Sequence, residues 1–348
     1  MISRRCLLAF AVLPKFLKAA GRGNTLAPAF QRYDDLATDL PVTRLTDPAF
    51  SSILPPASLS RRGNFMLYAS DAGGRFEAYR MDLKRGEARQ LTEAEGLQAR
   101  SLTLMPGESS FCYFDAGRLM MSGFSTASTQ AYKVSDGFAL SGAPHVTADG
   151  LYAALVESRG ATHRLRLVNL RTSTALTLGD ADEPMRDPLT RPKRASVLYL
   201  RGGGAFLANF DAKQNYRLRC EGTVAQAMWS PDGRSVLYLT AAGALREFVP
   251  DTNEDKAVAE TSQYAAFQRN GDASVFVGAG GTKVSPYILL LVRTVKRELT
   301  LCEHRASDPA LVTPQFSPNS QQVFFNSDLH GKPAIYRMDV EKLVEATA

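Results

Sequence analysis

The sequence predicts an all-β fold, a seven-bladed β-propeller that a strand near the N-terminus closes into a ring. Three observations predict it: a turn-and-strand motif occurs seven times, the spacing of the copies matches the length of one blade, and a strand absent from the C-terminal end is present near the N-terminus. At 348 residues, 45% of them hydrophobic, the chain can form such a ring as one domain.

The repeated motif is a tight turn followed by an apolar, β-branched and aromatic strand. It is clearest in residues 230–240, which begin Ser-Pro-Asp-Gly, and in residues 317–327. Weaker copies begin at Ser60, Met105, Thr147, Thr190 and Gln268, so consecutive copies lie 38 to 49 residues apart. A propeller blade of four strands needs roughly 40–45 residues, so each copy predicts one blade.

The two ends of the chain predict how the ring closes. The last copy is followed by a third strand at residues 335–340, but no fourth strand comes after it. Residues 42–46 (Val-Thr-Arg-Leu-Thr) resemble the fourth strand of the first blade at residues 88–92. We expect residues 42–46 to complete the last blade, which leaves no open edge. An eight-bladed or an open arrangement is the alternative.

The first residues are typical of an export signal. Arg4 and Arg5 precede a short apolar run, and small residues follow at Ala19 and Ala20. We expect a signal peptide at 1–24, which resembles a twin-arginine signal, a propeller at 25–342 and a C-terminal tail at 343–348. An ordinary secretion signal or an uncleaved anchor is the alternative. The expected location is periplasmic or secreted, with no transmembrane span in the mature chain.

The net charge argues against a nucleic-acid partner. The formal charge is +6, but Arg4, Arg5, Lys15 and Lys18 lie in the first twenty residues, which we expect to be removed. Without them the chain has a charge of about +2. A general nucleic-acid binder needs a concentrated basic face, so we expect none.

Several stretches resemble the oligogalacturonate lyase family over residues 30–342. They are Tyr68-Ala-Ser-Asp71, Tyr79-Arg-Met-Asp-Leu83, Trp229-Ser-Pro-Asp-Gly233, and Leu301-Cys-Glu-His304 leading into Pro314-Gln-Phe-Ser-Pro318. The turn motif is also similar to that of TolB-like propellers, which bind proteins. The resemblance implies β-elimination on short pectin fragments, with a divalent metal held by histidines and a glutamine and with a histidine as base.

The sequence departs from that family pattern at the expected metal ligands. Gln226, Leu311 and Thr313 stand where the resemblance places histidines, and Asp308 stands near the family's glutamine. No histidine occurs in residues 179–202, where the resemblance places the base. We therefore expect no metal, with manganese as the family alternative.

The remaining candidates for a site are few. His304 and Arg186 are weak catalytic candidates, and candidates for binding a substrate are Trp229, Gln226, His145, Arg191 and Arg194. Each has a structural alternative: a loop histidine bonded to the backbone, a tryptophan that fills the space between blades, and arginines on a solvated loop.

Three functions stay open at this point. The first is an exported propeller that binds an acidic oligosaccharide or a protein through the loops at one mouth of its ring. The second is an active oligogalacturonate lyase that uses other residues, and the third is a TolB-like protein-docking module.

Overall fold

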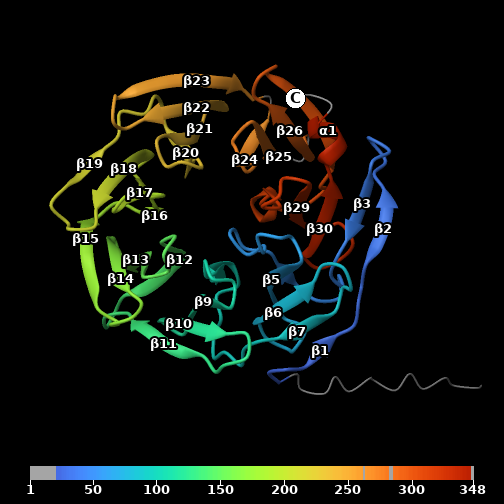
Figure 1. Cartoon of the computed structure of the whole chain (residues 1–348), viewed down its shortest axis with the longest axis horizontal. Helices are drawn as coiled ribbons and strands as arrows, with labels where there is room; N and C mark the ends of the chain where they lie inside the picture. Colours follow the sequence, from blue (N-terminus) through green and yellow to red (C-terminus); the bar gives the residue numbers. More distant parts are fainter. Residues whose placement is uncertain (1–20, 262, 282–284, 346–348) are drawn as a thin grey trace, which may run out of the picture.

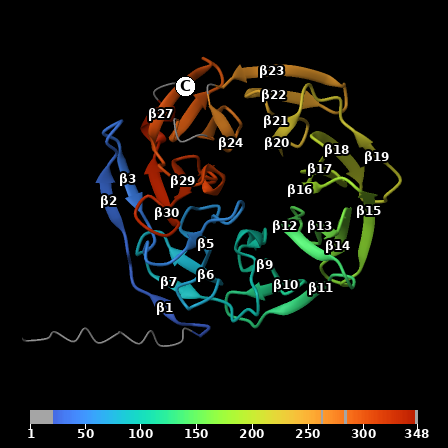
Figure 2. The ribbon, with the colours of Figure 1, turned by 180° about the vertical axis from the view of Figure 1, so that it is seen from behind.

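The computed structural model describes residues 21–261, 263–281 and 285–345, which form seven antiparallel sheets arranged as a ring (Figures 1 and 2). The predicted all-β, seven-bladed propeller is confirmed. Most of the predicted export signal, residues 1–20, lies outside the described residues. Helices are short in the described part of the chain, and none has the length and apolar composition needed to cross a membrane.

The first four blades follow one another along the chain, each from its innermost to its outermost strand. Blade 1 contains β4 (Ser52–Ile53), β5 (Phe65–Ser70), β6 (Glu77–Asp82), β7 (Ala88–Gln90) and, outermost, β1 (Thr25–Leu26). Blade 2 contains β8 (Thr103–Leu104), β9 (Ser110–Asp115), β10 (Arg118–Gly123) and β11 (Thr129–Lys133). Blade 3 contains β12 (Ala139–Val146), β13 (Tyr152–Arg159), β14 (Thr162–Asn169) and β15 (Ala175–Ala181). Blade 4 contains β16 (Met185–Thr190), β17 (Ser196–Arg201), β18 (Gly204–Asn209) and β19 (Asn215–Arg217).

The last three blades complete the ring. Blade 5 contains β20 (Val224–Trp229), β21 (Val236–Thr240), β22 (Ala244–Val249) and β23 (Glu254–Glu260). Blade 6 contains β24 (Tyr264–Arg269), β25 (Val275–Gly280), β26 (Tyr287–Val292) and β27 (Arg297–Glu303). Blade 7 contains β28 (Gln315–Phe316), β29 (Gln322–Ser327), β30 (Ala334–Asp339), β3 (Pro41–Arg44) and β2 (Gln31–Asp34). The other elements are η1 (Ala99–Ser101), η2 (Pro309–Leu311) and the helix α1 (Glu341–Glu345).

The seven predicted turns share one backbone pattern. In each turn the N–H of the first residue donates to the carbonyl five residues later, as from Ser230 to Ser235 and from Ser317 to Gln322. The pattern places the first residues of the fourth and sixth copies at Arg191 and Asn270, one and two residues after the expected starts. These two copies lack the Ser-Pro-Asp-Gly motif, so the sequence alone does not fix the residue at which each turn begins.

Ring closure occurs as the sequence predicts. Thr43 pairs with Arg337 and Arg44 with Tyr336, and the N–H of Leu45 donates to the carbonyl of Ile335 at 2.7 Å. The N-terminal segment also forms two outer strands that were not predicted: β2 lies outside β3 on blade 7, and β1 lies outside β7 on blade 1. Figure 1 shows this N-terminal segment running along the rim from blade 7 to blade 1.

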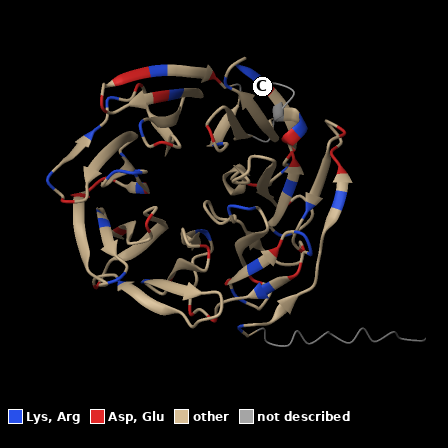
Figure 3. Ribbon diagram, in the orientation of Figure 1, with Lys and Arg blue, Asp and Glu red and all other residues tan. Residues whose placement is uncertain are grey.

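The core lies between neighbouring blades rather than at one centre. One apolar cluster joins Leu198 and Leu207 of blade 4 to Tyr238 of blade 5, and another joins blades 6 and 7. Strand residues are therefore buried on both faces, which explains the continuous apolar runs in the sequence. Acidic and basic residues are interspersed around the ring (Figure 3).

Candidate functional site

The ring has two different ends, because all seven innermost strands run in the same direction along its axis. The innermost strands begin at one end, which we call the leading end. They finish at the other, the turn end, where the seven turns that begin at Ser60 and its equivalents follow them. The connections that contain η1 and η2 both enter innermost strands and therefore belong to the leading end.

Arg186 and Asp187 form an exposed charged pair at the leading end, near the start of β16. Arg186 donates through Nη1 to the Asp187 carboxylate and through Nη2 to the carbonyl of Ala225 in blade 5 at 2.7 Å. The two side chains are 47% and 51% exposed, so both stay open to a ligand. Asp187 has a φ of 52°, within a register shift between β16 and β17. Aspartate adopts this left-handed conformation more readily than most residues, and twelve other non-glycine residues of the described chain share it.

Arg100 of η1 is a second arginine at the leading end. Its Nη2 donates to the carbonyl of Ala310 in η2 at 3.1 Å, although the two residues are 210 positions apart in the chain. The contact ties the connection before blade 2 to the connection before blade 7. Arg100 is exposed, so its remaining N–H groups are free for another acceptor.

Gln226 has a structural role on β20. Its Nε2 donates to the carbonyl of Phe267 in blade 6, and its Oε1 accepts from the N–H of Phe267, both at 2.9 Å. Each of two other glutamines makes one bond to the backbone of the following blade: Gln268 Oε1 accepts from the N–H of Phe316, and Gln315 Nε2 donates to the carbonyl of Pro55. The amide of Gln226 is thus part of a series of links between neighbouring innermost strands.

The other residues at the family's metal positions are also engaged. Thr313 Oγ1 accepts from Asn326 Nδ2 at 3.0 Å, and the Asp308 carboxylate caps η2 by accepting from the N–H of Ala310 at 2.9 Å. The side chain of Leu311 has no oxygen, nitrogen or sulfur atom that could bind a metal. A divalent cation needs several free oxygen or nitrogen ligands directed at one point, so these residues do not fit one. No cluster of three or more histidine, cysteine, aspartate or glutamate side chains suitable for a metal occurs among the described residues.

His304 is buried at the end of blade 6, with a side chain only 1% exposed. Its Nδ1 accepts from the N–H of Ala306 at 3.1 Å, and its Nε2 lies 3.3 Å from the carbonyl of Gly280, to which it donates. Burial lowers the pKa of this imidazole, so the ring is neutral. Both ring nitrogens are occupied by backbone partners, and no contact joins His304 to Arg186.

His145 lies on β12, the innermost strand of blade 3. Its Nδ1 accepts from the N–H of Thr190 at 3.1 Å and lies 2.9 Å from Thr190 Oγ1. Burial lowers its pKa to about 4. In this neutral ring Nε2 carries the proton, and the imidazole links blade 3 to blade 4.

Three candidates lie at the turn end, away from Arg186. Trp229 is 5% exposed and donates from Nε1 to the carbonyl of Leu189 at 3.1 Å, which places it between blades 4 and 5. Arg191 is buried with its guanidinium 4.8 Å from the centre of the Trp229 ring. Arg194 is 52% exposed and forms an ion pair with Asp251 at 2.9 Å. The seven predicted residues therefore do not form one site.

Sequence reasoning missed two residues of the leading end, Asp187 and Arg100. Asp187 stands four residues before the first turn residue Arg191, as Gln226 does before Ser230, but this equivalence needs the turn position that the structure supplies. No signal in the sequence pointed to Arg100, because its contact with Ala310 depends on the distance between blades 2 and 7 in the ring.

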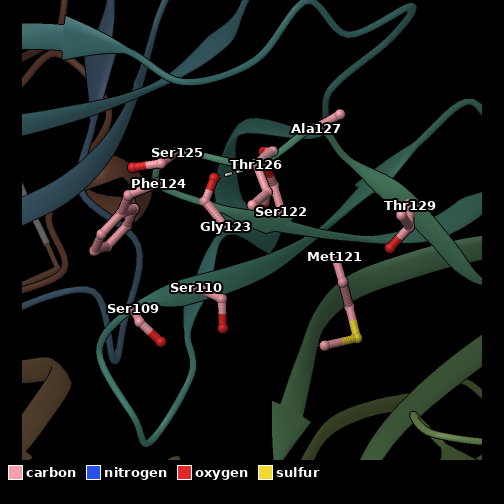
Figure 4. A pocket seen from close by; sticks show the side chains of 10 residues that line it. All are labelled: Ser109, Ser110, Met121, Ser122, Gly123, Phe124, Ser125, Thr126, Ala127 and Thr129. Atoms are coloured by element: carbon pink, nitrogen blue, oxygen red, sulfur yellow. Dashed lines mark hydrogen bonds between the residues drawn. The ribbon is translucent and has the colours of Figure 1, made fainter.

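A depression on blade 2 lies away from the leading end. Strands β9 and β10, the following loop and β11 form it, and serines, threonines, Met121 and Phe124 line it with a surface that is more apolar than polar (Figure 4). No charged side chain lines it. It therefore offers little that could select an ionic ligand.

Fold and site together define a seven-bladed β-propeller with an exposed arginine–aspartate pair at its leading end. No family model matches the chain. Over 90% of its length it is 24% identical to the oligogalacturonide lyase of Pectobacterium atrosepticum and 23% identical to the oligogalacturonate lyase of Dickeya dadantii, covering 97% of each. A solved oligogalacturonate lyase in complex with manganese superposes with a TM-score of 0.88, at 22% identity, over 94% of this chain and 100% of that one. The resemblance to oligogalacturonate lyases is confirmed.

Proposed function

We propose that this protein is an exported, periplasmic or secreted propeller that binds an acidic oligosaccharide of the uronate type at its leading end, without a resident transition metal. The observation that supports this most is Arg186, an exposed guanidinium already held in place by Asp187 and by the carbonyl of Ala225. A planar guanidinium matches a carboxylate in a bidentate manner.

The contacts of Arg186 leave room for such a ligand. A guanidinium has five N–H groups, and the structure commits Nη1 and Nη2 to one protein partner each. Arg100 at the same end offers a second donor for an extended, repeatedly charged sugar chain. The names of the curated relatives place oligogalacturonates among their substrates, which supports a uronate as the acidic group.

A lyase reaction through other residues is the second candidate function. The observation that favours it is Asp187, an exposed carboxylate at the leading end. In β-elimination a base removes the proton α to the uronate carboxylate, and a cation stabilises the charge that develops. Asp187 would take the proton and Arg186 would neutralise the carboxylate of the sugar. The glycosidic C–O bond at the β carbon would break as the α,β double bond forms, and water would protonate the leaving oxygen.

Titration calorimetry with trigalacturonate in the presence of a chelator tests the binding proposal. Arg186→Gln is expected to weaken binding about 10- to 100-fold, the loss of one charge-assisted contact worth roughly 1.5–3 kcal/mol. Arg194→Gln is the matched control, because Arg194 is similarly exposed and ion-paired but lies at the turn end. Equal weakening by both variants, or no binding by the unmodified protein, would reject the leading end as the site. In the latter case a protein partner is the remaining hypothesis.

Elemental analysis tests the metal part of the proposal separately. Purified protein is expected to contain far less than one manganese or zinc per chain, because the residues at the family positions are engaged elsewhere. About one such ion per chain would show that a site exists outside those positions.

A further inference from the structure

The last residues of the leader predicted at 1–24 are themselves bound to the ring. The N–H of Gly23 donates to the carbonyl of Gln90 at 2.9 Å, and the N–H of Gln90 donates to the carbonyl of Asn24 at 2.8 Å. The N–H of Arg22 donates to Glu93 Oε1 at 2.8 Å. The guanidinium of Arg22 also reaches blade 2, where it donates to the carbonyls of Gly123, at 3.3 Å, and Thr126.

Signal cleavage requires small residues one and three positions before the bond. Three bonds after the apolar run meet this condition in the sequence. They are the bond before Arg22, with Ala19 and Gly21, the bond before Asn24, with Gly21 and Gly23, and the bond before Phe30, with Ala27 and Ala29.

The structure separates these three bonds by what each cleavage would remove. Cleavage before Phe30 removes β1, whose Thr25 and Leu26 pair with Arg89 and Ala88 at the outer edge of blade 1. Cleavage before Asn24 removes the bond from Gly23 to Gln90 and every contact of Arg22. Cleavage before Arg22 keeps all of these contacts and removes one other, the bond from the N–H of Asn24 to the carbonyl of Gly21 at 3.0 Å.

We propose that the leader is removed by hydrolysis of the Gly21–Arg22 peptide bond, and that the new α-ammonium of Arg22 forms an ion pair with Glu93. A signal peptidase supplies the catalysis and water is the co-reactant, which leaves a carboxylate on Gly21 and an amine on Arg22. The nitrogen that becomes charged is the one already 2.8 Å from Glu93 Oε1. Processing thus converts a hydrogen bond from a neutral amide to the carboxylate into an ion pair between an ammonium and the carboxylate.

Export of the full-length chain in a bacterial host, followed by intact-mass measurement of the exported protein, tests the position of cleavage. The expected mature chain begins at Arg22. A chain that begins at Asn24 or Phe30, or that retains the leader, overturns the proposal.

Two leader variants provide a matched check. Ala19→Leu places a bulky residue three positions before the bond and is expected to abolish the Arg22 terminus. Ala20→Leu changes the tolerant position between the two small residues and is expected to leave that terminus unchanged. An Arg22 terminus in both variants would show that the small-residue rule does not select this bond.

The ion pair has a readout of its own. Glu93→Gln is expected to lower the unfolding midpoint of the processed protein by about 1–2 °C. The partner raises the pKa of the amine above its ordinary value of about 8, so the effect is present below that pH and is lost as the pH rises through the raised value. In a control chain that begins Met-Gly21-Arg22 the nitrogen stays an amide, and the substitution should show no such pH dependence. The same pH dependence in both chains would rule out the ion pair.

Discussion

At the scale of single residues, this ring uses polar side chains to join one blade to the next. Gln226 and His145 stood out in the sequence as possible ligands or binding groups, yet each bonds to the backbone of the following blade. The sequence also left a structural alternative open for His304 and Trp229, and in the structure their ring nitrogens bond to backbone partners. It could not choose between the alternatives, because the choice depends on which atoms a neighbouring blade presents.

The lowered pKa of His145 predicts a loss of stability in acid. Its pKa in the folded protein is about 4, below the ordinary value of 6.5, so the unfolded chain binds the proton more readily. The stabilisation is complete above pH 6.5 and is lost as the pH falls towards 4, with a size of about 1–3 kcal/mol. Burial also lowers the pKa values of His304 and His330, so their contributions have the same sign.

A variant isolates the contribution of His145. In His145→Asn the side-chain oxygen can still accept from the N–H of Thr190, but the titrating ring is gone. Urea denaturation between pH 7 and pH 4 is expected to show a smaller loss of unfolding free energy for the variant than for the unmodified protein. Equal losses would place the acid sensitivity elsewhere.

At the scale of elements, the turns carry most of what the sequence could predict. The Ser-Pro-Asp-Gly letters encode a local conformation, so the motif identified the blades without knowledge of their packing. The strand β16 shows the limit of this approach. Arg186 and Arg191 are five residues apart and looked like one basic stretch, but they lie at opposite ends of that strand, one exposed and one buried. Because β16 runs along the axis of the ring, it places these two arginines at opposite ends of the propeller.

Two turn glycines with similar φ angles give a matched prediction. Gly233 has a φ of 71°, and a Cβ there would lie 2.5 Å from the carbonyl oxygen of Pro192. Gly150 has a φ of 72°, but a Cβ there would meet only the end of Met105 at 3.5 Å and Pro106 at 3.8 Å. Gly150→Ala should therefore cost about 1 kcal/mol from the left-handed conformation alone, and Gly233→Ala about 2–4 kcal/mol. Chemical denaturation measures both, and equal costs would contradict the close contact with Pro192.

At the scale of the whole molecule, closure was predictable because it is a matter of counting strands. The last blade lacked a fourth strand and residues 42–46 supplied one, which the pairing of β3 with β30 confirms. The additional outer strands β1 and β2 were not predicted, because residues 25–34 carry no copy of the repeat. The sequence also could not predict that Arg100 and Arg186 share the leading end, because they come from blades that are not adjacent.

The central claim is that an acidic oligosaccharide binds the ring without a metal, and thermal unfolding of the mature protein tests it most directly. The protein is heated with and without trigalacturonate, in chelator and in Mn²⁺, while absorbance of the unsaturated product is recorded. Trigalacturonate is expected to raise the midpoint by several degrees in chelator, at a concentration about a hundredfold above Kd, with no further gain from Mn²⁺ and no product. Product formed in chelator would favour the lyase reaction through Asp187. A midpoint that rises only when Mn²⁺ is present would contradict the account.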